Sequence, residues 1–435
     1  MGYSSITIKD IPSIIMSSLV LSLIPLFAVI FVLDEIDGST KNTVLANKNE
    51  TTIQNEISAS EYPEEENRTS SMSVTDEAAA SADAFAKATS TTYNNIARFI
   101  AGMPQLYENE FSALESYPSW IKYSASAGRR WEELKKGKFR NIINFRDSEL
   151  VGVNSKARTV FYPFSGPDFL HAGLFFPNAD EFIMIGLEKA GRLPNTVTIT
   201  NDSLMMGYIS TINRSLRDVL SLSFFITKKM KTDFKNSKLE GLLPALMVFI
   251  VRTDHVILDI RFFNLNKDGT PAYLAHGFGG QSTGVEIAFK DKNNEFKKLQ
   301  YLSVNLADSE LKSGSPSFAY LGRIQGEKVT YLKAASYLMH NNYFGTIRSF
   351  ILNSSFAVLQ DDSGIPYRFF SSKEWNKKLY GSYNGTIGLF AGRGQKDLSA
   401  AYEKAGQTKP LGFGIGYKHR KGSSNLMLAI KELNL

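Results

Sequence analysis

An uninterrupted apolar run near the start of the chain constrains its architecture more than any other feature. Residues 11–33 read IPSIIMSSLVLSLIPLFAVIFVL and carry no charged side chain. A helix of this length measures about 34 Å, enough to cross a hydrocarbon core about 30 Å thick. The run therefore predicts a transmembrane helix, and its two prolines fit because membrane helices accept proline more readily than soluble ones.

A cleaved signal is the alternative to a retained anchor. Secretory signals have a basic first part, an apolar core of about 7–15 residues and a small-residue cleavage site. Here Lys9 is offset by Asp10, the apolar run is longer, and no A-x-A pattern follows it. We expect a single-pass anchor, with secretion after cleavage as the alternative. Lys9 favours a cytoplasmic location for residues 1–10, with the rest of the chain outside.

The composition narrows the classes of site that the chain offers. It has no cysteine, which excludes disulfides, thiolate metal sites and cysteine nucleophiles. With the anchor, this favours a bacterial envelope protein, held at the inner membrane with its body in the periplasm. No two of the five histidines lie at i, i+3 or i, i+4 spacing, so no metal site is predicted. The glycine-rich pieces lack a strand–turn–helix frame, so no cofactor is expected.

Charge is distributed unevenly along the chain. Residues 34–83 contain twelve acidic and three basic residues, whereas residues 84–435 carry a net charge of +15. Residues 34–72 are also poor in aromatic residues, and we expect an acidic, disordered tether there. The basic body would suit envelope proteins or anionic envelope polymers, although a lysine-rich solvated surface is the simpler explanation. The basic run at 129–140 is interrupted by glutamates, so no nucleic-acid partner is expected.

Hydrophobic periodicity predicts a helical segment over residues 73–150 and a mixed body over residues 151–435. We predict helices at 204–229 and 329–359, the second broken near Gly345, and strands at 159–164, 181–187, 244–251, 255–263, 284–290, 299–306, 386–390, 411–417 and 425–430. Strands cluster rather than alternate with helices, which argues against a doubly wound sheet. The fold class expected is α+β, with a mainly antiparallel sheet flanked by helices.

One motif matches a serine hydrolase signature. Gly280–Gly284 fits G-x-S-x-G and follows His276-Gly277-Phe278-Gly279, similar to the oxyanion loop of α/β-hydrolases. The signature needs a helix directly after the serine. The residues that follow Ser282 alternate like a strand, so a glycine-rich turn is the better interpretation.

Two polar loops flanked by aromatic residues are the candidate binding sites. Residues 161–171 read FYPFSGPDFLH, and residues 360–368 read QDDSGIPYR. If the loops meet, their side chains would form an acid–base or sugar-binding site. The residues in question are Ser165, Asp168, His171, Asp361, Asp362 and Arg368. The alternative is turn chemistry, in which Asp and Ser bond to their own backbone beside Gly and Pro.

The same loops carry a resemblance to other proteins. FYPFSGPDF, IGLEKAGRLP, QDDSGIPYRFF and PLGFGIGY resemble a family of uncharacterised bacterial envelope proteins, over about residues 155–430. The resemblance implies an envelope location and transfers no catalytic residue. The missing lipoprotein cysteine departs from the form expected of relatives.

Together these features predict a membrane-anchored envelope protein that works as a binding or assembly module. No residue is predicted to be catalytic. The alternative is an envelope hydrolase that uses the carboxylates of the loops at 165–171 and 361–368.

Overall fold

The computed structural model describes residues 91–222, 241–275, 282–324 and 326–432. The predicted transmembrane helix at 11–33 and the acidic tether at 34–72 lie outside the described residues. Within them, no helix combines the length and apolarity needed to cross a bilayer.

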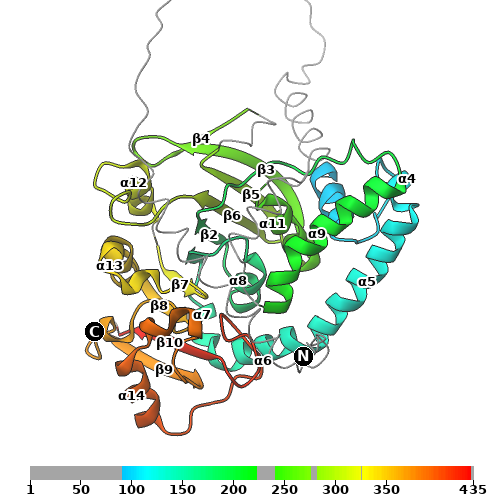
Figure 1. The fold of residues 1–435 in the computed structure, drawn as a ribbon. Coiled ribbons are helices and arrows are strands. Elements are labelled where there is room, and N and C mark those ends of the chain that lie inside the picture. Colours follow the sequence, from blue (N-terminus) through cyan, green and yellow to red (C-terminus); the bar gives the residue numbers. More distant parts are fainter. Residues whose placement is uncertain (1–90, 223–240, 276–281, 325, 433–435) are drawn as a thin grey trace, which may run out of the picture. The chain divides into compact units, whose positions relative to one another are not determined.

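A single sheet of ten strands organises the described part of the chain (Figure 1). The strands follow the order β4-β3-β5-β6-β2-β1-β7-β8-β10-β9 across the sheet. Their bounds are β1 Thr159–Pro163, β2 Glu181–Gly186, β3 Val256–Leu265, β4 Pro271–Tyr273, β5 Gly284–Lys290, β6 Phe296–Ser303, β7 Lys328–Leu332, β8 Ser355–Gln360, β9 Trp375–Gly381 and β10 Asn425–Lys431. The predicted strands at 159–164, 181–187, 255–263, 284–290, 299–306 and 425–430 are thereby confirmed.

Among the pairings of these strands, five are antiparallel and four are parallel. A mixed body with a mostly antiparallel sheet is therefore confirmed. The parallel pairings, however, join β6, β2, β1, β7 and β8 at the centre of the sheet. There the strands alternate with helices, as β1–α8–β2 and β7–α13–β8. The argument against doubly wound organisation was wrong for this centre, because the antiparallel strands β3–β5 interrupt the alternation along the sequence.

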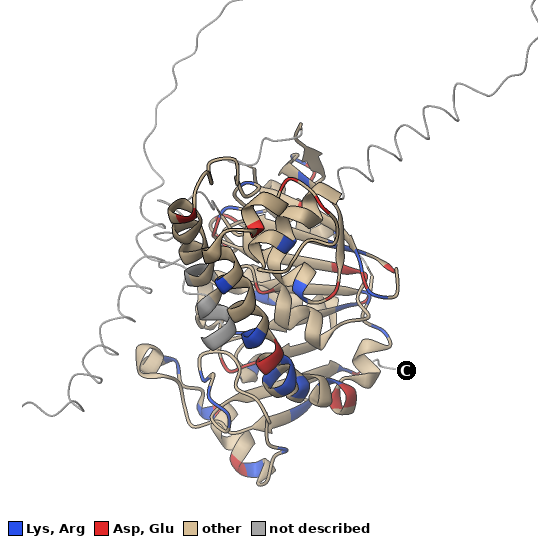
Figure 2. Cartoon of the chain, turned by 90° about the vertical axis from the view of Figure 1, so that its right-hand side faces the viewer, with Lys and Arg blue, Asp and Glu red and all other residues tan. Residues whose placement is uncertain are grey.

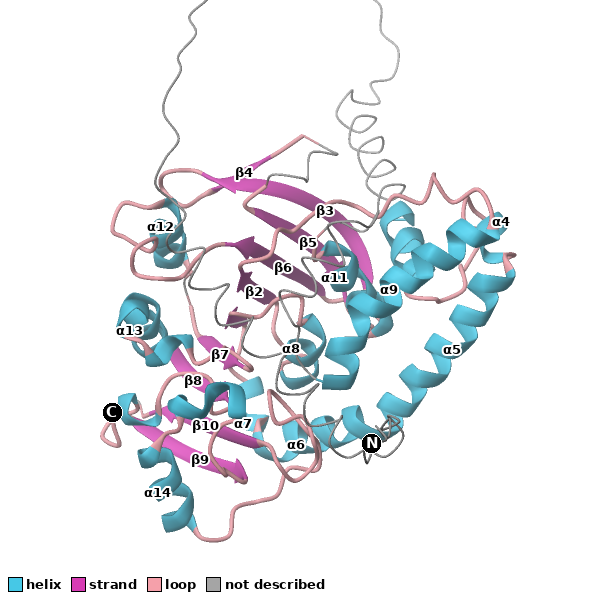
Figure 3. Ribbon diagram, in the orientation of Figure 1, coloured by secondary structure: helices cyan, strands magenta, loops and turns pink. Residues whose placement is uncertain are grey.

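Helices cover both faces of the sheet (Figure 3). One hydrophobic core lies between the sheet and α5, α6, α8, α9 and α11, and a second involves α12 and α13. The helix bounds are α4 Ser112–Glu115, α5 Pro118–Leu134, α6 Arg140–Glu149, α7 Val151–Asn154, α8 Phe169–Phe175, α9 Asp202–Leu222, α11 Leu243–Arg252, α12 Pro316–Arg323, α13 Gly345–Ser354 and α14 Lys396–Ala405. Lysine and arginine residues are distributed over many of these elements (Figure 2).

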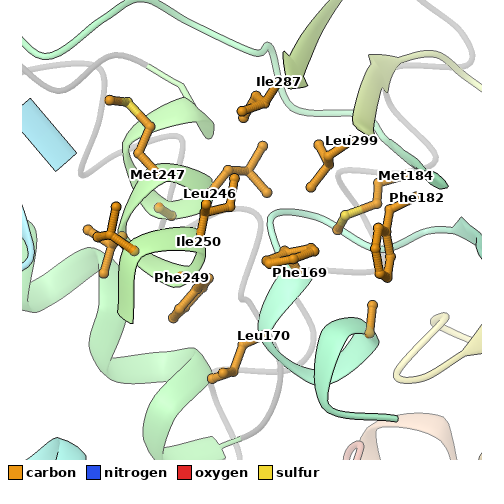
Figure 4. Packing of buried hydrophobic residues seen from close by; sticks show 14 of the residues in the cluster. Phe169, Leu170, Phe182, Met184, Leu246, Met247, Phe249, Ile250, Ile287 and Leu299 are labelled. Atoms are coloured by element: carbon orange, nitrogen blue, oxygen red, sulfur yellow. The ribbon is translucent and has the colours of Figure 1, made fainter. Parts of the chain in front are cut away.

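The predicted strand at 244–251 is wrong, because this segment forms α11. Every residue from Leu243 to Val251 is buried. A continuous apolar run of this length is compatible with a buried strand or a buried helix, and periodicity alone does not separate them. Pro244 lies in the first turn, where a missing N–H costs nothing. Figure 4 shows Leu246 and Ile250 of α11 in the cluster that also includes Phe169 of α8 and Phe182 of β2.

The predicted helix at 329–359 is also largely wrong. Its two ends form the buried parallel strands β7 and β8, and only Gly345–Ser354 is α-helical. Gly345 begins α13 rather than breaking it. Buried parallel strands are apolar on both faces and lose the alternation that identifies a strand in a sequence.

Three other segments can be compared with the predictions, and two of them differ. In the predicted helical segment, α5, a π-helical turn at Lys135–Phe139 and α6 follow one another without a loop. Residues 386–390 form no strand, and a 3-10 helix covers Gly388–Arg393. Residues 411–417 form a loop whose glycines Gly414 and Gly416 are packed against neighbouring atoms.

Candidate functional site

The chain reverses its direction of travel across the sheet between β1 and β7. These two strands are neighbours and run parallel. β1 leads through α8 to β2 on one side, whereas β7 leads through α13 to β8 on the other. In open sheets with parallel strands, ligands bind outside the carboxyl ends of the strands at such a switch point. The residues that follow β1, β7 and β8 are therefore the first place to look for a site.

Asp168 and His171 lie directly after β1, in the first turn of α8. The Asp168 carboxylate caps the helix, because Oδ1 accepts from the backbone N–H of His171. Nδ1 of the His171 ring lies 2.7 Å from the same oxygen. The Tyr162 hydroxyl donates to Oδ2 at 2.9 Å. All three side chains are buried, with His171 only 1% exposed.

Lys333, the first residue after β7, completes this group. Its buried ammonium donates to Oδ2 of Asp168, and its Nζ lies 3.2 Å from Nδ1 of His171. An Asp168 carboxylate beside Nδ1 assigns the ring proton to Nδ1, which leaves the lone pair on Nε2. Nε2 is buried and has no hydrogen-bond partner among the described residues. The structure thus holds a histidine with one nitrogen fixed and the other unsatisfied.

Burial and mutual charge set the protonation of these groups. Burial lowers the pKa of His171 to about 4, against the attraction of Asp168, so the ring is neutral at pH 7. Burial alone would raise the pKa of Asp168, but His171 and Lys333 hold it well below its usual value. Burial also lowers the pKa of Lys333, and the Asp168 carboxylate opposes this shift. The carboxylate and its ammonium partner form a buried ion pair beside a neutral imidazole.

Lys138 approaches the same group from the π-helical turn between α5 and α6. Burial and repulsion by Lys333 lower its pKa to about 7, against the attraction of Asp168. π-helical turns inside longer helices occur frequently at functional sites. Lys138 is therefore a half-buried amine that changes charge near neutral pH.

The loop after β8 meets this group through residues 334–337. Oδ2 of Asp361 accepts from the backbone N–H of Ala334 at 2.9 Å, and Oδ1 accepts from the N–H of Ser363. Asp362 accepts from the Tyr337 hydroxyl at 2.7 Å and, through Oδ1, from Asn425. The two carboxylates therefore have separate partners. Burial and the charge of Asp362 raise the pKa of Asp361 to about 6.

The backbone at these strand ends is strained. Six described residues other than glycine have positive φ, and two of them, Asp254 and Asn294, belong to the types that tolerate it. The other four are Phe164, Ala334, Ser336 and Tyr337, with φ between 51° and 60°. All four lie immediately after β1 or β7. Such residues cost about 1–3 kcal/mol each and cluster at ligand clamps and active sites.

The structure places four of the six predicted residues around residues 333–337. Asp168 and His171 contact Lys333, whereas Asp361 and Asp362 bond to residues 334 and 337.

The remaining two lie differently. The Ser165 hydroxyl donates to the backbone oxygen of Gly166, which is turn chemistry, and also to that of Ile185 in the neighbouring strand β2. Arg368 is exposed, and its guanidinium lies over the ring of Phe369.

Sequence reasoning missed Lys333, Tyr162 and Lys138. Lys333 lay within a predicted helix, although a lysine directly after the β-branched and aromatic run Val-Thr-Tyr-Leu at 329–332 was an available signal. Ser282 is buried and followed directly by β5, so the helix that a hydrolase elbow requires is absent there. Residues 276–281 lie outside the described part of the chain.

Within the described ranges, no group of three or more His, Asp or Glu side chains is placed to hold a metal ion. Comparison with known proteins finds no match to a family model, to a curated protein or to a solved structure.

Proposed function

We propose that the body of this chain is a binding module that takes a small polar ligand at the carboxyl ends of β1, β7 and β8. The observation that carries the proposal is the buried, unsatisfied Nε2 of His171. A buried polar atom without a partner costs about 1–3 kcal/mol. A ligand hydroxyl or amide that donates to Nε2 would recover this free energy.

The strained backbone supports the same conclusion. The backbone N–H groups of residues 334–336 donate hydrogen bonds to side chains rather than to a neighbouring strand. The acceptors are Asp361, Ser363 and Tyr417, in that order. A segment held by side chains rather than by strand pairing can move as those side chains change partners. Because His171 is 1% exposed, a ligand reaches Nε2 only when a neighbouring segment moves. Residues 334–337 are the segment suited to that role.

A ligand screen with a matched variant tests the proposal. The full-length protein is titrated with monosaccharides, amino acids and nucleosides, and binding is followed by ligand-observed NMR. In His171→Asn the amide can still donate to Asp168, but Nε2 is lost. We expect a bound compound to lose about 5- to 150-fold in affinity for this variant, the equivalent of roughly 1–3 kcal/mol. Equal affinity for the wild type and a folded variant would overturn the proposal.

A hydrolase is the second candidate, and one further observation favours it. A carboxylate that holds Nδ1 and leaves Nε2 available is the arrangement of a general base. Asp361, with a pKa of about 6, titrates near the range that general acids use. Initial rates on chromogenic esters, glycosides and phosphates test this candidate. Turnover must fall in both His171→Asn and Asp361→Asn, and an unchanged rate in either folded variant would eliminate the hydrolase.

The proposed location is the inner membrane, with residues 11–33 as a single anchor and the body in the periplasm. The support is the uncharged apolar run and Lys9 before it. Protease added to spheroplasts should degrade the body, and complete protection would contradict this orientation. N-terminal sequencing of the mature protein distinguishes the anchor from a cleaved signal.

A further inference from the structure

A groove of about 560 Å³ runs beside β9, the last strand of the sheet. Its lining includes the four consecutive residues Lys377, Lys378, Leu379 and Tyr380. Consecutive side chains of a strand point to opposite faces of the sheet. A groove that touches all four residues therefore lies along the outer edge of β9 and not on one face.

Backbone groups of β9 point into this edge. Trp375 N–H donates to Ser371, and Gly381 N–H donates to Lys409, each at 2.9 Å and each away from β10. Because the N–H groups of an antiparallel strand alternate between its two sides, Lys377 and Leu379 point theirs outward as well. Among the described residues, neither of these amides has a backbone hydrogen bond outside the sheet. An open row of amides and carbonyls is a template for a further strand.

The chain itself begins such an addition at one end of the groove. Lys409 forms an isolated parallel bridge with Tyr380, and the Thr408 hydroxyl donates to the carbonyl of Gly381. The groove continues from this point along Leu379 and Lys377. Figure 3 shows β9 at the end of the sheet, with α14 beside it.

The lining of the groove is basic and partly apolar. Lys378, Lys404 and Lys409 are exposed, and Lys377 is half-buried. Glu149 is the acidic residue of the lining, and its carboxylate is held by Lys409 at 2.6 Å and by the Tyr380 hydroxyl. Apolar contact is offered by Leu379, Ala401 and Ala405. The charge of the groove thus complements a chain that mixes acidic and apolar side chains.

We propose that this groove binds an acidic, extended peptide segment of a partner protein, which adds to β9 as a further strand. Main-chain hydrogen bonds supply affinity in such complexes, and the flanking side chains supply specificity. The exposed backbone edge favours a peptide over a phosphate-bearing ligand, which would use the lysines and leave the amides unpaired. The inference is independent of the polar ligand proposed above, because it rests on different residues at another edge of the fold.

Fluorescence anisotropy with a labelled eight-residue peptide of alternating Glu and Val tests the proposal on the full-length protein. We expect binding that weakens about tenfold or more in Lys378→Glu/Lys404→Glu. The control is Lys312→Glu/Lys421→Glu, which changes the same charge at two exposed lysines outside the groove lining. Its affinity should stay within about twofold of the wild type.

Peptides N-methylated at alternate residues separate strand addition from simple charge attraction. Methylation of one alternate set should abolish binding and methylation of the other should not, because only one set faces β9. The proposal would be overturned if the peptide did not bind, or if the control variant lost as much affinity as Lys378→Glu/Lys404→Glu. It would also be overturned if neither methylated peptide lost affinity. If inorganic polyphosphate binds and the peptide does not compete with it, the groove is a phosphate site and the peptide proposal is overturned.

Discussion

Nδ1 of His171 lies 2.7 Å from Oδ1 of Asp168, within one turn at the start of α8. The other carboxylate oxygen is held by Lys333, which is 165 residues away in the sequence. Local structure therefore fixes the histidine, and a long-range ion pair fixes the carboxylate.

Removing one partner of the buried ion pair should be costly. In Asp168→Asn the Lys333 ammonium loses its carboxylate inside the protein, and we expect a loss of about 3–5 kcal/mol in the free energy of unfolding. Urea denaturation measures this loss. The double variant Asp168→Asn/Lys333→Met should lose less than Asp168→Asn alone. If the double variant instead lost as much as the sum of the Asp168→Asn and Lys333→Met losses in the free energy of unfolding, the two side chains would not be coupled.

Gly416 should tolerate no side chain, because Asp361 packs against it. A Cβ at Gly416 would lie 2.0 Å from Oδ2 of Asp361, and its φ is +63°. Gly385 is the control, with φ +73° and open space around a Cβ. We expect Gly385→Ala to cost about 1–2 kcal/mol from backbone strain, and Gly416→Ala about 3 kcal/mol or more. Equal costs by thermal denaturation would contradict the packing.

Glycine should relieve the strain after β7. Ala334 has φ +51°, and in this left-handed conformation alanine costs about 1–2 kcal/mol more than glycine. Glycine in turn adds conformational entropy to the unfolded chain, which opposes folding by about 0.5–1 kcal/mol. Ala334→Gly should therefore stabilise the protein by about 0.5–1 kcal/mol. Ala113→Gly, at an exposed position of α4, should do the opposite. A destabilised Ala334→Gly variant would show that the strain is absent.

The pKa of Lys138 predicts a pH dependence with a defined sign. The folded-state pKa of about 7 lies below the ordinary value of 10.5, so the unfolded chain binds more protons between these pH values. Stability of the wild type should therefore rise with pH from about 7 to 10.5. The Lys138→Met variant lacks this rise. Its free energy of unfolding should therefore exceed that of the wild type most below pH 7, and the difference should shrink towards pH 9. Urea denaturation at pH 6 and pH 9 measures the difference, and a constant difference would exclude the shift.

Local patterns in the sequence identified part of this site. Asp168 and His171 stand three residues apart in a polar loop flanked by aromatic residues, and that pattern in the sequence identified them. The same pattern identified Asp361 and Asp362 after β8. Asp361 and Asp362 have separate partners, as adjacent carboxylates in one loop need not act as a pair. Lys333 was not identified, because the residues before it, 329–332, matched a helix as well as a buried strand.

The sequence by itself determined those strands whose burial alternates or whose ends carry turn residues, whereas the anchor and the tether stay predictions. The tertiary structure decided the parallel centre of the sheet, the helical state of residues 243–252 and the joining of Asp168 to Lys333. The physical reason is that segments buried on all sides lose the periodicity that distinguishes helix from strand, so their state is selected by the surfaces they pack against. Contacts between distant strand ends depend on the order of strands in the sheet, which no local pattern encodes.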